Sequence, residues 1–189
     1  MMVIISKSIK AINYNKLQIV TINYFSLLFI LLSLFITAVP LHAQQTNDQF
    51  NAVLTSAESF FKSLKEKNYA KTWTLLSQKS QGTIVDDVFK EILKNQASQK
   101  TAVEYSKEQI SADFKSVGPL SRSYWDSFIV YFDPDSVLEQ SKWDIGTIKK
   151  DKAEISIQYK KSDTPAMLQM FKENNVWKVG LVETFWTRK

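Results

Sequence analysis

Cysteine is absent from the 189-residue chain, and histidine occurs once, as His42. Without thiols the chain forms no disulfide bond, and zinc sites or nucleophiles built on cysteine are excluded. Catalytic triads that need an imidazole are excluded as well once the N-terminal segment that carries His42 is removed. Glycine and proline are scarce, with four residues of each, and no internal repeat or flexible linker divides the sequence.

Acidic residues are missing from the first 43 positions, whose basic residues are Lys7, Lys10 and Lys16. The uncharged apolar segment 25–39 follows, and small residues lead up to Ala43. This order is typical of a secretory signal peptide. We therefore predict that residues 1–43 are a signal peptide cleaved before Gln44, and that the protein is secreted or periplasmic and meets the membrane only before cleavage. An uncleaved anchor is the alternative, although a spanning helix needs about 20 apolar residues.

The charge of the mature chain is close to balanced. The whole chain has 24 basic and 19 acidic residues, and removing the three N-terminal lysines leaves 21 basic residues and a net charge of +2. Basic and acidic residues are interspersed, so the sequence offers no basic stripe for a phosphate backbone. We predict no nucleic-acid partner, and we interpret the cluster Lys149, Lys150 and Lys152 as a solvated turn.

Residues 44–189 are long enough for one domain with a substantial core. Apolar residues recur at steps of three and four from Phe50 to Leu64, which predicts a helix of about five turns. The spacing of Thr46 and Gln49 is that of a capping box and predicts the start of this helix. Asn68 is the predicted stop.

Further helices are predicted along the next sixty residues. The same period predicts a short helix over 69–76 that Gly82 ends, and a third helix opened by Thr83. A second capping-box spacing at 101–104 predicts another helix, through Ile110 and Phe114. The apolar residues that step by four over 120–132 predict one more, which ends before Pro134.

The pattern then changes to strict alternation. Apolar residues alternate with polar ones over 153–159, as in a half-exposed antiparallel strand. Neighbouring strands are predicted over 143–147, over 166–170 and over 177–185, with a hairpin at 174–175. Helices followed by a four-strand meander predict an α+β fold in which the N-terminal helices pack on one face of an antiparallel sheet.

Two stretches carry a family resemblance: SFFKSLKEKNYAKTWTLLS at 59–77 and MLQMFKENNVWKVGLVETFW at 167–186. They resemble the first helix pair and the final hairpin of small exported bacterial domains of the nuclear-transport-factor-2-like superfamily, which has a cystatin-like α+β cone. The resemblance implies a curved sheet, a pocket at the open end of the cone and dimerisation through the sheet. It implies no single activity, because this fold carries isomerases, dehydratases, hydrolases and members without known catalysis.

Glu183 is the weak candidate for acid or base chemistry. If the last strand alternates from Trp177 onward, this carboxylate lies on an apolar face, where desolvation raises its pKa. Alternatively the strand ends near Thr184 and the carboxylate meets water or a basic partner. Asp126 is a second candidate, for which Tyr131 or Tyr159 could supply a phenol, but it falls off the apolar stripe of its helix and is expected to be solvated.

The acidic residues Asp133, Asp135 and Glu139 could be imagined as a calcium site built from oxygen ligands. They lack the spacing and the glycine of an EF-hand loop, and Pro134 and Ser136 suit the end of one helix and the cap of another. We therefore predict no metal site and no cofactor.

The candidate pocket residues are Trp125, Tyr131, Trp143, Tyr159 and Trp177. A bulge or bend at the glycine of position 146 would open the concave face of the sheet. The sequence thus predicts an exported domain that binds a small apolar molecule or a protein partner without catalysis. A cofactor-free hydrolase, isomerase or dehydratase that uses a pocket carboxylate with a tyrosine is the alternative, and a purely structural dimer is a third.

Overall fold

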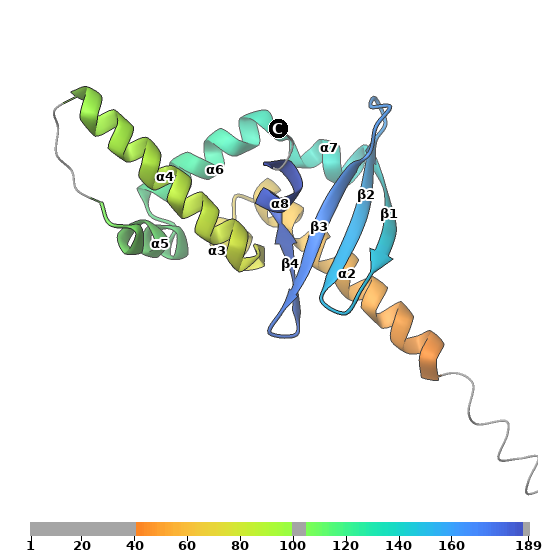
Figure 1. Cartoon of the computed structure of the whole chain (residues 1–189). Helices are drawn as coiled ribbons and strands as arrows, with labels where there is room; N and C mark the ends of the chain where they lie inside the picture. The colour runs from red at the N-terminus through yellow and green to blue at the C-terminus, as the bar shows by residue number, and fades with distance from the viewer. Residues whose placement is uncertain (1–40, 100–104, 187–189) are drawn as a thin grey trace, which may run out of the picture. The chain divides into compact units, whose positions relative to one another are not determined.

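The computed structural model describes residues 41–99 and 105–186 (Figure 1). The predicted apolar core of the signal peptide, 25–39, lies outside the described residues. The chain divides into two compact units, residues 1–47 and 48–189, and the sheet and the helix packing belong to the second unit. None of the described helices has the length and apolar character needed to cross a membrane.

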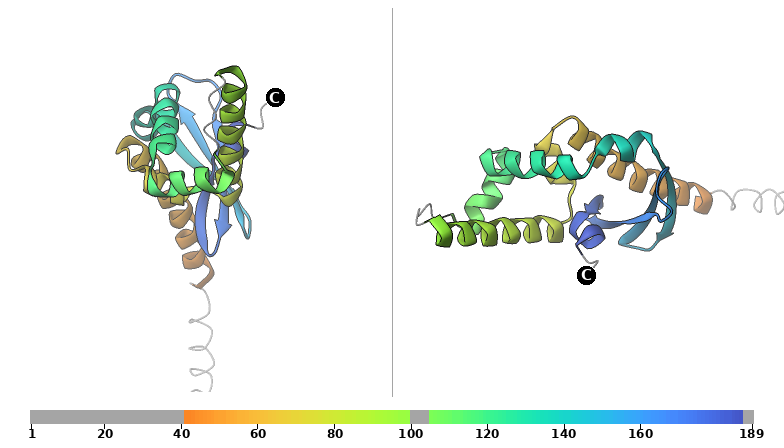
Figure 2. Two further views of the ribbon diagram at one scale, coloured as in Figure 1. Left: turned by 90° about the vertical axis from the view of Figure 1, so that its left-hand side faces the viewer. Right: turned by 90° about the horizontal axis from the view of Figure 1, so that it is seen from above.

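Six described helices precede the sheet, and the short helix α8 follows it. The six are α2 (Leu41–Lys65), α3 (Tyr69–Leu75), α4 (Gln78–Gln99), α5 (Lys107–Ser116), α6 (Pro119–Tyr131) and α7 (Pro134–Glu139), and α8 is Leu181–Phe185. Helix α5 runs across between α4 and α6, which lie on either side of it (Figure 2).

The four strands form one antiparallel meander in the order β1-β2-β3-β4. They are β1 (Ser141–Ile148), β2 (Lys152–Tyr159), β3 (Ala166–Glu173) and β4 (Val176–Gly180). Pairing shifts register between Ile145 and Ile148, so the predicted irregularity at Gly146 is confirmed. The predicted α+β fold is confirmed too, with the described helices mostly N-terminal to a C-terminal meander.

The core lies between α2 and the inner face of the sheet. The alternation predicted for β2 is present, because Ala153, Ile155 and Ile157 are buried while Glu154 and Ser156 are half-exposed. From α2, the buried residues are Val53, Ala57, Phe60, Phe61 and Leu64. The α2 side chains therefore occupy the inner face, where the apolar sides of β2, β3 and β4 would otherwise meet water.

The junction of α3 and α4 differs from the prediction. Helix α3 ends at Leu75 and α4 begins at Gln78, so Gly82 and Thr83 lie inside α4 and neither ends nor starts a helix. The reason is a long-range contact. Leu76 is extended and bridges Val179 of β4, whose carbonyl accepts from the Ser77 amide at 2.9 Å. Residues 76 and 77 therefore cover the outer edge of β4.

The predicted helix starts were also placed wrongly. Helix α2 already runs through Thr46 and Gln49, so these residues do not cap it. Helix α2 ends at Lys65, and Asn68 both donates its amide to the Ser63 carbonyl in the last turn of α2 at 2.8 Å and is the N-cap of α3. The capping box predicted at 101–104 lies outside the described residues, and the one that the structure shows starts α5, where Ser106 and Gln109 bond each other's backbone.

The last strand is shorter than predicted. β4 ends at Gly180, and the residues predicted to extend it form α8. The hydroxyl of Thr184 accepts from the Gln169 amide at 2.9 Å and donates to the carbonyl of Gly180 at 2.6 Å. This hydroxyl supplies the acceptor that a continuing strand would have offered to β3, so the chain turns away without leaving the Gln169 amide unpaired.

Candidate functional site

Two of the predicted pocket residues are core residues. Trp125 on α6 has no exposed surface, and its ring packs against Tyr69, Tyr124 and Phe128, with centroid separations of 6.3, 5.0 and 5.6 Å. Trp177 on β4 is 4% exposed, and its backbone carbonyl accepts a hydrogen bond from the Ser56 hydroxyl of α2 at 2.6 Å. Both side chains serve the packing of helices and sheet.

Of the remaining three pocket candidates, Trp143 and Tyr159 lie on one face of the paired strands β1 and β2, and Tyr131 lies on α6. Trp143 on β1 is half-buried, and its indole N–H donates to the carbonyl of Val137 at 2.9 Å. Tyr159 is the last residue of β2, opposite Ser141. Tyr131 ends α6 with 91% of its surface exposed. The five predicted residues therefore do not gather around one pocket.

Glu183 does not lie on a strand face. It is on α8, where its two carboxylate oxygens accept hydrogen bonds from Ser77 at 3.1 Å and from Ser80 at 2.6 Å. These serines belong to the first turn of α4 and the residue before it, so the carboxylate lies where the helix dipole favours negative charge. The contact ties α8 to α4.

Asp126 has a phenol partner that the sequence did not single out. The hydroxyl of Tyr69 donates to Oδ1 of Asp126 at 2.5 Å, and Nζ of Lys67 lies 3.1 Å from the same oxygen. Burial raises the pKa of Tyr69, and the hydrogen bond from Tyr69 lowers the pKa of Asp126. Both shifts move away from neutrality, which is the opposite of what general acid or base catalysis requires.

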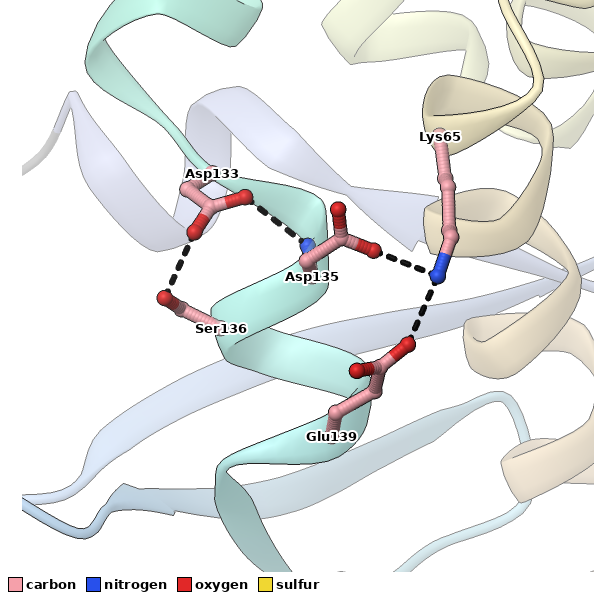
Figure 3. Close-up of polar contacts among 5 residues, drawn as sticks. All are labelled: Lys65, Asp133, Asp135, Ser136 and Glu139. Carbon is pink, nitrogen blue, oxygen red and sulfur yellow. Dashed lines mark hydrogen bonds and ion pairs between the residues drawn. The ribbon is translucent and has the colours of Figure 1, made fainter.

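Two of the three acidic residues that could be imagined as a calcium site form ion pairs with a lysine (Figure 3). Nζ of Lys65 lies 2.6 Å from Oδ1 of Asp135 and 2.7 Å from Oε1 of Glu139, so its ammonium links α2 to α7. Asp133 caps α7, accepting from the Asp135 amide at 3.0 Å and from the Ser136 hydroxyl at 2.6 Å. Among the described residues, no group of three or more acidic, histidine or cysteine side chains is arranged to hold a metal.

These contacts predict that the protein loses stability in acid. Hydrogen bonding to Ser136 holds the pKa of Asp133 below its usual value, and Tyr69 does the same for Asp126. A depressed folded-state pKa stabilises the protein above the unfolded-state pKa near 3.8, and this stabilisation is lost as pH falls through the folded-state value. The melting temperature, followed by circular dichroism, should therefore fall below about pH 4.

The control is the double variant Asp126→Asn and Asp133→Asn, which keeps side-chain acceptors but cannot titrate. Its melting temperature should be lower than that of the parent at pH 7 and should depend less on pH below about 4. Equal slopes in the two proteins would show that these carboxylates do not control the acid response.

An open groove lies between α4, α6 and α8. It has a volume of about 540 Å³, and its apolar lining includes Val88, Ile92, Tyr124, Phe128, Tyr131 and Trp186. The residues from α4 recur at steps of three and four, as do those from α6, so one face of each helix borders the groove. A second hollow of about 420 Å³ adjoins it and shares Phe128, Tyr131 and Trp186.

No known protein helps to place this groove. Comparison of the chain with protein-family models, with curated proteins and with solved structures found no match.

The groove combines an aromatic wall with a polar rim. Glu91, Asn95, Ser123 and Ser127 supply the carboxylate, the amide and the hydroxyls around it. Burial raises the pKa of Tyr124, so its phenol stays neutral in the physiological range. The apolar period along the sequence did predict both helices. It did not show that the apolar side chains of α4 and α6 leave an open space between the two helices.

Proposed function

We propose that this protein is an exported α+β domain that binds an apolar segment of a protein partner in the groove between α4, α6 and α8. The observation that carries the proposal is the exposure of two large aromatic side chains on the groove wall. Tyr131 is 91% exposed and Trp186 is 40% exposed. Aromatic residues of this kind dominate the energetics of protein interfaces.

The shape of the groove favours a peptide over a small molecule. Small-molecule sites bury most of the ligand surface, whereas this groove is open to solvent along one side. An amphipathic helix or an extended segment could lay its apolar side chains along the wall and leave its polar side in water. The rim residues Asn95, Ser123 and Ser127 would surround this contact with polar groups.

The proposal keeps the predicted resemblance to exported nuclear-transport-factor-2-like domains, on the evidence of the helix pair at 59–77 and the hairpin at 167–186. It places binding away from the inner face of the sheet, because α2 side chains occupy that face. A dimer through the sheet would leave the groove accessible, since the groove is lined by helices alone and by Trp186, the residue that follows α8.

Peptide selection tests the proposal. A random 12-residue peptide library selected against the purified protein should yield apolar sequences, and the variant Tyr131→Ala, Trp186→Ala should bind the selected peptides at least tenfold more weakly. The matched control is Val176→Ala, which removes an exposed apolar side chain, 49% exposed, at the far hairpin. Selected peptides that bind the double variant as tightly as the parent would contradict the proposed site.

A further inference from the structure

We propose a second binding site, for organic carboxylates with an apolar body, in the groove between α3, α4 and α5. This groove has a volume of about 490 Å³, within the range of small-molecule sites. It shares no lining residue with the groove between α4, α6 and α8, which we call the aromatic groove. The two proposals can therefore be tested separately.

The walls come from one face of each helix. On α4 the lining residues are Gln78, Gln81, Gly82, Val85 and Asp86, and on α5 they are Lys107, Glu108, Ser111, Ala112 and Lys115. Within each helix they recur mainly at steps of three and four. The small residues Gly82, Ser111 and Ala112 keep the two helices from filling the space between them, and Val85 supplies an apolar surface.

Gly82 points to an open space rather than to a packing requirement. It lies inside α4, where glycine is less favourable than alanine. A Cβ atom at this position would meet no heavy atom within 4 Å, so no neighbouring group demands glycine. Without a side chain at Gly82 the groove is deeper at this point, because a ligand can approach the backbone of α4.

Trp73 supplies a buried donor. It lines the groove and is 2% exposed, and its indole N–H has no acceptor among the described residues. Its backbone carbonyl accepts from the side-chain Nε2 of Gln81 at 2.7 Å, and its ring packs on Phe114. A buried N–H without a partner is unfavourable, so an acceptor atom brought by a ligand would stabilise this site.

The groove lining has two carboxylates and two ammonium groups, and one of the ammonium groups is available to an anion. The carboxylate of Asp86 is already paired with Lys107 at 2.7 Å. Hydrogen bonds from its own backbone and from Ser106 lower the pKa of Glu108, so this carboxylate stays ionised and accepts hydrogen bonds at the start of α5. Lys115 makes no ion pair with any residue that the structure describes, and its ammonium can bind a carboxylate at the end of the groove where α5 finishes.

Calorimetry with octanoate tests the site, with 1-octanol and octylamine as neutral and cationic probes of the same chain length. Octanoate should bind, and the other two should bind at least tenfold more weakly. Gly82→Leu fills the groove with a good helix former and should reduce octanoate affinity at least tenfold, while Lys115→Ala should reduce it about fivefold. Circular dichroism of each variant checks that the fold is kept.

Trp73→Phe keeps an aromatic ring and removes the indole N–H donor. It should therefore weaken the binding of octanoate more than the binding of 1-octanol. Tyr131→Ala, in the aromatic groove, should leave octanoate binding unchanged. The proposal is wrong if octanoate does not bind, if all three probes bind equally, or if Gly82→Leu binds octanoate as the parent does.

Discussion

Replacing Trp125 by alanine should lower the free energy of unfolding by about 3 to 5 kcal/mol, because the change removes a large buried ring and leaves a cavity. The side chain has no exposed surface, and the three aromatic rings around it would lose their central partner. Urea unfolding followed by circular dichroism measures the change.

Trp186→Ala is the matched control for this experiment. It deletes the same side chain from a position that is 40% exposed, so its cost should stay below about 1 kcal/mol. Equal losses in the two variants would mean that α6 does not pack on the core through Trp125.

Gly180→Ala should destabilise the protein by about 1 to 3 kcal/mol, although it adds a single methyl group. A Cβ at Gly180 would clash with Cε2 of Phe171, and it would lie only 2.9 Å from Cδ2 of the same ring and 3.1 Å from the carbonyl oxygen of Gln169. The ring of Phe171 covers the end of β4 because this position has no side chain. Thermal and urea unfolding both report the effect.

The same substitution at Gly82 should have the opposite sign. A Cβ there has no neighbour within 4 Å, so Gly82→Ala should stabilise α4 by about 0.5 to 1 kcal/mol. If both alanine variants moved stability in the same direction, the contrast between a crowded and an open glycine would be refuted.

The elements that the sequence predicted well are those with local, periodic patterns. The alternation over 153–159 was sufficient to predict β2, and the step of four over 120–132 was sufficient to predict α6. In both cases the spacing of the apolar residues matches the period of the helix or the strand. The local sequence therefore indicates both the secondary structure and its apolar face.

The boundaries that failed depend on partners far away in the sequence. Leu76 interrupts the helical period because it pairs with Val179, and β4 ends early because Thr184 bonds Gln169. No local signal reports such contacts. The candidate site could not be predicted for a related reason. A stripe of apolar residues shows which face of a helix is apolar, but it does not show whether the side chains of the neighbouring helix contact that face.

The pairing of Leu76 with Val179 also affects the order in which parts of the domain can fold. The Ser77 amide needs the carbonyl of Val179, and the hydroxyl of Ser80 accepts from the Val182 amide. The start of α4 therefore acquires hydrogen bonds from residues about a hundred positions later in the chain, which are synthesised after it. A nascent chain that has not yet reached α8 lacks these partners, so the start of α4 is secured only after β4 and α8 have been made.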